Sequence, residues 1–392
     1  MKKLILMITI TIIAALILAS CAGDETVIPS DNIAETTTAA AGEQPSLEFD
    51  YSMELSYAEN FSVDYYKGGY KMITISDGRQ FLTIPEGTDI PSDVDSAVTV
   101  LQMPINNILI SSTPTMSLIA AIGAVNRVSM TTTDVDSWYI QSVISAMNDG
   151  KLTYIGDYKA PDFELITSGE PQLSVFSTML ASTPEVEEKL NELKVPILLD
   201  QATFEEHPLG RVEWMKLYGV LFDAEDIAER AFNGQAEYVS SISTESTGKS
   251  VSMFYITSKG VLYARKGGDY MIKMLELAGG EYVFADMDPE DTGTNQMEFE
   301  TFYAGAKDAD YIIYIWSLGG KPETMADFLE KNELFTEFKA VRDGNVWCTS
   351  PDYFQISDTL GYMIKDMNRM LTLTPESDQA AEAEINYLAR LK

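Results

Sequence analysis

From about residue 105 onward, the sequence alternates short apolar runs with longer segments of helical periodicity, and this alternation restricts the fold more than any other feature. The run Ile108-Leu109-Ile110 has the composition of a buried strand, and a helical pattern opens directly after it at Thr113-Pro114. Threonine as a cap and proline at the first helical position form a frequent helix start. Strands that alternate with helices favour a mainly parallel sheet with helices on both faces.

The alternation occurs twice along the chain. The first series ends with the strand pattern at residues 196–199, and the second begins near Val251 and contains a strong strand pattern at residues 310–316. A helical pattern that starts after Asp223, which we interpret as its N-cap, separates the two series. The sequence therefore predicts an α/β fold with two Rossmann-like lobes joined by a long helix.

A β-rich segment precedes the first lobe, because two strand patterns flank Lys67-Gly68-Gly69, a hairpin signal. The whole chain is then expected to divide into a signal peptide (1–20), a lipidated cysteine and tether (21–46), a β-rich extension (47–104), an N-terminal lobe (105–222), an interlobe helix (223–246), a C-terminal lobe (247–374) and a C-terminal helix (375–392).

The N-terminus has the features of a secretion signal. Two lysines precede an apolar stretch at residues 4–18, which is too short for a comfortable membrane span. The following Leu18-Ala19-Ser20-Cys21 resembles the bacterial lipobox, in which cleavage precedes the cysteine and its thiol is lipidated. This resemblance implies a lipid anchor at Cys21 and an extracytoplasmic position at the bacterial cell membrane. Residues 22–46 are small, polar and acidic, as expected for a flexible tether.

The charge and the cysteine count exclude several classes of protein. The chain contains 27 basic and 60 acidic residues, a net charge of −33, which disfavours nucleic acid as a partner. Cys348 is the only cysteine besides Cys21, so the mature chain has no partner thiol for an intramolecular disulfide if Cys21 is lipidated. The core must then be held by burial alone.

Catalytic motifs are absent from the sequence. His207 is the only histidine, which excludes a zinc site built from several histidines, and no G-x-S-x-G surrounds a serine. Residues 243–250 end like a P-loop but lack its first glycine, and the acidic residues 286–291 lack EF-hand spacing. We therefore expect a binding protein without a cofactor or metal site of its own, and not an enzyme.

Ligands of open α/β sheets bind beyond the carboxyl ends of the strands. Aromatic and basic residues near the predicted strand ends are therefore the candidates for ligand binding, although each of them could equally be a surface charge or a core aromatic. A cation such as Arg211 beside aromatic rings could hold an anionic complex. The candidates are Trp138, Tyr158, Arg211, Trp214, Arg265 and Tyr270.

Five segments resemble, in the same order, the substrate-binding lipoproteins of iron-complex and cobalamin ABC importers, the class III periplasmic binding proteins. Residues 155–164 look like the G-x-Y-x-x-P-x-x-E segment of this family, and residues 206–214 (EHPLGRVEW) are close to the signature of a subgroup. The remaining three segments are residues 107–128, Glu276-Leu277-Ala278-Gly279-Gly280 and residues 340–346.

This resemblance implies a monomeric protein with the ligand between two lobes and a rigid helix that limits closure. It also implies that one exposed glutamate in each lobe docks onto the ABC permease. Glu164 matches in the first lobe, and Glu300, with Glu298 as the alternative, in the second.

The single histidine fits a chelated metal better than a bare ion, because zinc or manganese would need several histidine or carboxylate ligands. A ferric siderophore is the first hypothesis for the ligand, and haem or cobalamin is the alternative. A lipid-anchored enzyme or an adhesion module is the rival from a different class.

Overall fold

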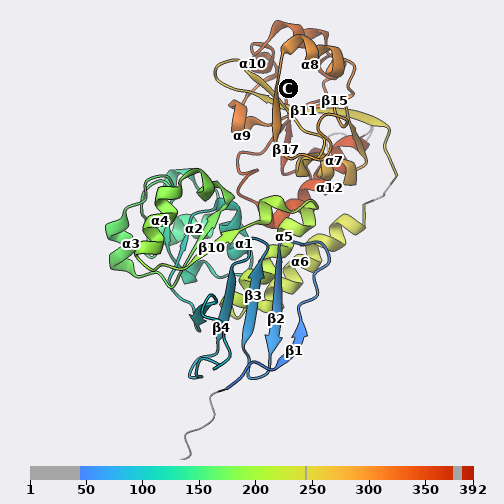
Figure 1. Cartoon of the computed structure of the whole chain (residues 1–392). Coiled ribbons are helices and arrows are strands. Elements are labelled where there is room, and N and C mark those ends of the chain that lie inside the picture. The colour runs from blue at the N-terminus through green and yellow to red at the C-terminus, as the bar shows by residue number, and fades with distance from the viewer. Residues whose placement is uncertain (1–44, 243–244, 374–381) are drawn as a thin grey trace, which may run out of the picture. The chain divides into compact units, whose positions relative to one another are not determined.

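The computed structural model describes residues 45–242, 245–373 and 382–392, and all of these belong to one compact unit (Figure 1). The signal peptide, Cys21 and nearly all of the tether lie outside the described residues. In the part of the chain that the structure describes, no helix has both the length and the apolar character that crossing a membrane requires.

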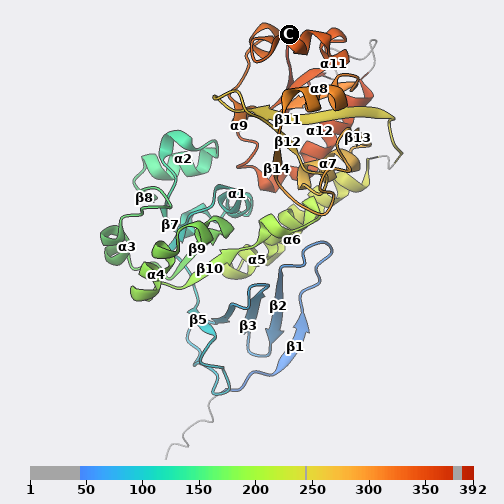
Figure 2. The ribbon, with the colours of Figure 1, turned by 45° about the horizontal axis from the view of Figure 1, so that its top comes forward.

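The β-rich extension folds into a five-stranded sheet in which the strands follow one another in sequence order. Neighbouring strands are antiparallel except for the last pair, which is parallel. Figure 2 shows this sheet beside the two helices that follow the first lobe. The strands are β1 (Phe49–Ser52), β2 (Phe61–Tyr66), β3 (Lys71–Ile75), β4 (Gln80–Ile84) and β5 (Thr99–Gln102).

The first lobe contains a five-stranded parallel sheet of order β10-β9-β6-β7-β8. Alternate residues of β6 point to opposite faces, so Ile108 and Ile110 pack with α1 and α2, while Leu109 packs with α3 and α4. The elements are β6 (Ile108–Ile110), α1 (Thr113–Ala121), β7 (Val128–Thr131), α2 (Gln141–Asn148), β8 (Thr153–Tyr154), α3 (Phe163–Gly169), β9 (Leu173–Ser177), α4 (Pro184–Glu192) and β10 (Ile197–Asp200), with 3-10 turns at Val125–Arg127, Val135–Ser137, Thr178–Ser182 and Ala202–Phe204.

The second lobe has a mixed sheet of order β14-β12-β11-β15-β16-β17, with β13 paired to β11. The pairs among β11, β13, β15 and β16 are parallel, and those with β12, β14 and β17 are antiparallel. The elements are β11 (Lys249–Ile256), β12 (Leu262–Arg265), α7 (Tyr270–Leu277), β13 (Gly280–Tyr282), β14 (Thr294–Met297), α8 (Phe299–Ala306), β15 (Tyr311–Tyr314), α9 (Trp316–Gly319), α10 (Met325–Leu329), α11 (Lys339–Arg342), β16 (Val346–Thr349), α12 (Leu360–Thr372) and β17 (Leu388–Arg390), with 3-10 turns at Glu333–Glu337 and Ser357–Thr359.

The α/β class and the mainly parallel sheets are confirmed, but the predicted C-terminal helix is wrong where the structure can be compared with it. Residues 388–390 form strand β17, which pairs with β16 at the edge of the second sheet. Pairing places Leu388 and Leu391 in the core of the lobe. Residues 374–381 lie outside the described range.

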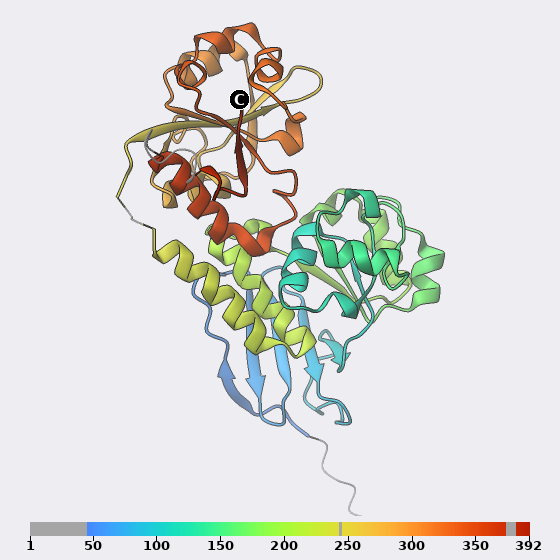
Figure 3. The same ribbon diagram turned by 180° about the vertical axis from the view of Figure 1, so that it is seen from behind.

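Helices α5 (Pro208–Phe222) and α6 (Glu225–Ser240) connect the lobes. Asp223 is not the N-cap of α6: it adopts a left-handed conformation with φ of 54° and closes α5 at its C-terminus. Fourteen of the fifteen residues of α5 are buried, and Arg211 is the exception. Figure 3 shows α6 lying beside α12 of the second lobe. The buried centre of the fold is therefore α5, and not the helix after Asp223.

A buried carboxylate fastens the extension to α5. The side chain of Glu213 is fully buried and accepts hydrogen bonds from the backbone N–H groups of residues 56–58, at 2.8–2.9 Å. Lys216 lies one turn further along α5, with its Nζ 3.0 Å from both Glu213 and Glu229. These partners compensate the charge of Glu213, which would otherwise be costly to bury.

A second carboxylate, that of Glu205, binds the next two residues of the extension. Glu205 accepts from the backbone N–H groups of residues 59 and 60, at 2.9 and 3.0 Å, and from the indole Nε1 of Trp214, at 2.8 Å. Gly210 lies between the two acidic residues, and a β-carbon there would come within 2.9 Å of the Tyr57 carbonyl oxygen. The glycine is therefore required by the close approach of the extension to α5.

Candidate functional site

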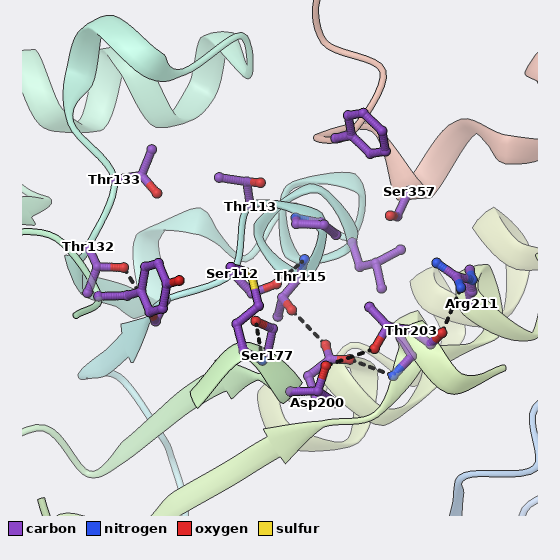
Figure 4. Close-up of a pocket in the computed structure, with 18 of the residues that line it drawn as sticks. Ser112, Thr113, Thr115, Thr132, Thr133, Ser177, Asp200, Thr203, Arg211 and Ser357 are labelled. Carbon is purple, nitrogen blue, oxygen red and sulfur yellow. Dashed lines mark hydrogen bonds between the residues drawn. The ribbon is translucent and has the colours of Figure 1, made fainter. Parts of the chain in front are cut away.

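A cavity of about 610 Å³ lies where the carboxyl ends of the first-lobe strands face the second lobe (Figure 4). The loops that follow β6, β7, β8, β9 and β10 all contribute to its wall, and α5 contributes Arg211. The second lobe contributes Tyr270 from α7, and Tyr353, Phe354 and Ser357 from the segment before α12. The volume and the position at strand ends are typical of a small-molecule binding site.

Serine and threonine are the most frequent residue types on the wall of the cavity. Eleven of its twenty-five lining residues are serine or threonine, so a ligand would meet many neutral hydrogen-bonding groups. Some of these groups already bond to each other: Ser111 Oγ lies 2.8 Å from Thr132 Oγ1, and Thr178 Oγ1 lies 3.2 Å from Thr203 Oγ1. Such pairs link neighbouring strand ends.

Asp200 anchors the base of the cavity. Its carboxylate accepts hydrogen bonds from Thr115 Oγ1 at 2.6 Å, from the Tyr218 hydroxyl at 2.5 Å and from the Ala202 N–H at 2.8 Å. Burial raises the pKa of Asp200 from its usual value, and these three hydrogen bonds oppose the rise. The Asp200 side chain therefore ties the end of β10 to α1 and α5. With these three bonds made, it has little remaining capacity to accept a hydrogen bond from a ligand.

Arg211 is the one cation among the described residues that line the cavity. Its Nη2 donates to the Thr203 carbonyl at 2.7 Å, and its guanidinium carbon lies 3.8 Å from the centre of the Tyr270 ring. The Nε atom is buried and has no hydrogen-bond partner. Burial also lowers the pKa of Arg211 from its usual value. The Tyr270 ring and the Thr203 carbonyl thus hold the guanidinium at the boundary between the lobes.

The structure brings together three of the six ligand candidates that the sequence indicates. Tyr158, Arg211 and Tyr270 all line the cavity, from a first-lobe loop, from α5 and from α7 respectively. Whether they contact a ligand stays a prediction.

The other three candidates do not line the cavity. Trp138 is buried, and its Nε1 donates to the Thr133 carbonyl at 3.1 Å, so it supports the loop from behind. Arg265 is 5% exposed and lies 3.5 Å from Asp269, with its guanidinium 5.8 Å from the Phe354 ring. Trp214 is fully buried against Phe61 of the extension. The structure therefore does not bring these three side chains together with the other candidates.

Most residues of the cavity wall are not among the candidates that the sequence indicates. The hydroxyl-bearing residues follow the predicted strands directly, for example Ser111-Ser112-Thr113 after β6 and Ser177-Thr178 after β9. The rule that ligands bind beyond strand ends was sufficient to select them. A search restricted to rings and charges passed over them.

Gln355 clamps the two walls of the cavity together. Its Nε2 donates to the Ser137 carbonyl at 2.6 Å, and its Oε1 accepts from the Tyr139 N–H at 3.0 Å. Ser137 belongs to the first-lobe wall, and Phe354, next to Gln355, to the second-lobe wall. One amide side chain therefore makes a two-point bridge between the lobes, which we call the Gln355 clamp.

His207 has a structural position. It caps the N-terminus of α5, with Nδ1 accepting from the Leu209 N–H at 3.1 Å, and its ring stacks on Tyr57 at 4.5 Å. Burial, followed by the charge of Lys273, lowers the pKa of His207. The described residues contain no group of three or more His, Cys, Asp or Glu side chains that could hold a metal ion.

The glutamates that were expected to meet a permease are exposed in the structure. Glu164 lies in the first turn of α3 and Glu300 in the first turn of α8, and the alternative Glu298 is the N-cap residue of α8. Their role in docking stays a prediction.

Comparison with known proteins places this geometry in a family. Residues 108–353, more than half of the chain, match the family described as "periplasmic binding protein". A lipoprotein of Methanocaldococcus jannaschii is 24% identical over 381 residues, which cover 91% of this chain and 89% of the relative.

Two solved structures share the fold. The petrobactin-binding protein YclQ of Bacillus subtilis has a TM-score of 0.57 and 13% identity, covering 78% of this chain and 99% of its own. The periplasmic haem-binding protein HutB of Vibrio cholerae has a TM-score of 0.56 and 13% identity, covering 69% and 100%. Family members and fold neighbours are solute-binding proteins and not enzymes. The chain belongs to the periplasmic binding protein family.

Proposed function

We propose that this protein is an extracytoplasmic lipoprotein, anchored through Cys21, that captures an iron complex of the ferric siderophore type and delivers it to an ABC permease. The observation that carries the proposal is the cavity between the lobes, at the carboxyl ends of all five strands of the first sheet. The absence of a metal-binding group among the described residues supports a ligand that brings its own coordination sphere. Haem or cobalamin in the same role is the second candidate, favoured by the haem-binding fold neighbour.

A ligand panel tests this proposal. The purified protein is titrated with ferric siderophores, haem and cobalamin, and binding is followed by calorimetry and by thermal shift. Binding to the folded state alone should raise the unfolding temperature in a concentration-dependent manner. Metal-free siderophores serve as controls, and silence across the whole panel would contradict the proposal.

Replacing Gln355 with alanine should accelerate both ligand association and dissociation by about tenfold, because the two hydrogen bonds of the clamp together contribute about 1–2 kcal/mol to the closed state. The equilibrium Kd should change much less, because Gln355 does not line the cavity and its loss removes no ligand contact. Stopped-flow fluorescence measures both rates. The control is Gln80→Ala, an exposed glutamine on β4. A change confined to the dissociation rate would instead identify Gln355 as a ligand contact.

Charge reversal at the two docking candidates should separate binding from transport. Glu164→Lys and Glu300→Lys alter exposed helix-end side chains outside the cavity lining, so the Kd for ligand should stay within about twofold of the original. ATP-dependent uptake by the cognate permease should fall in each variant. Glu185→Lys, on the exposed start of α4, is the control. Normal uptake in both docking variants would refute their role.

A further inference from the structure

We propose that the cavity selects metal chelates without net negative charge, such as neutral ferric trihydroxamate complexes, over polyanionic chelates such as ferric tricatecholates. This inference rests on the proposed function and narrows its ligand class. Three hydroxamate monoanions neutralise one ferric ion, whereas three catecholate dianions leave the complex trianionic. The two types of ligand therefore demand opposite electrostatic surroundings.

The charged side chains on the cavity wall disfavour a trianionic chelate. The described lining residues include three carboxylates beside the single cation Arg211: Asp134, Asp157 and Asp200. Asp200 is buried at the base, and Asp134 and Asp157 are exposed. Burial raises the pKa of Asp200, so we leave it out of the balance; one positive charge against the two exposed carboxylates then leaves the wall at −1. A trianionic chelate would lose its hydration on entry and gain no compensating positive field.

Two cations that contact rings of the lining, Lys159 and Arg265, do not line the cavity themselves. Lys159 is exposed, with Nζ 5.4 Å from the centre of the Tyr158 ring, and its backbone N–H donates to the nearby Asp157. Arg265 lies behind Phe354 and has Asp269 at 3.5 Å. Arg265 is thus accompanied by a carboxylate, Lys159 is exposed to solvent, and Arg211 itself already donates to the Thr203 carbonyl.

The neutral hydroxyl groups on the cavity wall suit a hydroxamate ligand. Hydroxyl side chains can donate to the carbonyl and N–O oxygens of a hydroxamate and can also accept from amide groups on its backbone. Arg211 also lines the cavity, and a guanidinium can donate to a chelate oxygen. A hydrogen-bonding ligand without net negative charge satisfies this wall, while a polyanion does not.

The test compares a ferric trihydroxamate with a ferric tricatecholate on the purified full-length protein, by calorimetry at low and high ionic strength. We expect the neutral complex to bind at least about a hundredfold more tightly, with an affinity that salt changes by less than about twofold. Equal or tighter binding of the tricatecholate would overturn the inference and leave the proposed function intact. If neither complex binds, and haem and cobalamin also fail, the proposed function falls together with the inference.

A pair of variants provides a second measurement. The double variant Asp134→Asn and Asp157→Asn removes two carboxylates but keeps an oxygen for the backbone N–H groups that each one caps. This variant should lower the ratio of the affinities for the neutral and the trianionic complex by about tenfold, because the repulsion of the trianion decreases. The double variant Asp149→Asn and Glu185→Gln, exposed and outside the lining, should leave the preference unchanged. An unchanged preference in the first pair would contradict an electrostatic origin.

Discussion

Replacement of Glu213 by alanine is expected to lower the free energy of unfolding by about 3–5 kcal/mol, the usual cost of breaking a buried ion pair. The substitution leaves the backbone N–H groups of residues 56–58 without their acceptor and removes one of the two carboxylates that neutralise the buried Lys216. Urea unfolding followed by circular dichroism measures the change.

Glu229→Ala is the matched control for this experiment. Glu229 pairs with the same Lys216 at the same 3.0 Å distance, but its side chain is 52% exposed, so its removal should cost less than about 1 kcal/mol. Glu213→Gln should give an intermediate loss, because one amide oxygen remains as an acceptor. Equal losses for the alanine variants of Glu213 and Glu229 would show that the extension does not depend on the buried carboxylate.

Replacement of Arg211 by alanine is expected to weaken ligand binding by about 1.5–3 kcal/mol, or roughly 10- to 150-fold, the range for hydrogen bonds from a charged group. Calorimetric titration measures this loss. Arg211→Lys should recover only part of it, because a lysine cannot reproduce the planar contact with the Tyr270 ring and the donor to the Thr203 carbonyl.

Arg230→Ala, on the exposed surface of α6, controls for loss of a positive charge from the connecting helices. A folded Arg211→Ala protein with unchanged Kd would remove Arg211 from the binding site. Near-ultraviolet circular dichroism of the unliganded variants establishes that they are folded.

The alternation of patterns was sufficient to predict the α/β class, because strand and helix periodicities alternate clearly from residue 105 onward. The end of the chain was mispredicted for a physical reason. The apolar residues Leu388 and Leu391 fit either a helix or a strand, and only the free edge of β16 decides in favour of the strand. Such pairing between distant segments is not encoded locally.

For the candidate site, the sequence indicated the region of the cavity, but only three of its six candidate side chains line it. Arg211 and Trp214 lie three residues apart in α5, yet one lines the cavity and the other packs under the extension. Which face of α5 meets which layer depends on the extension, whose contacts span more than 140 residues of sequence. No local pattern could separate a ligand residue from a core residue there.

The contrast between the buried helix α5 and the loops that line the cavity has an evolutionary consequence. Nearly the whole helix is committed to packing, so it offers little room for substitution, whereas the cavity wall is built mostly from loop residues that follow strands. Ligand preference can therefore change through exchanges in these loops while the scaffold persists.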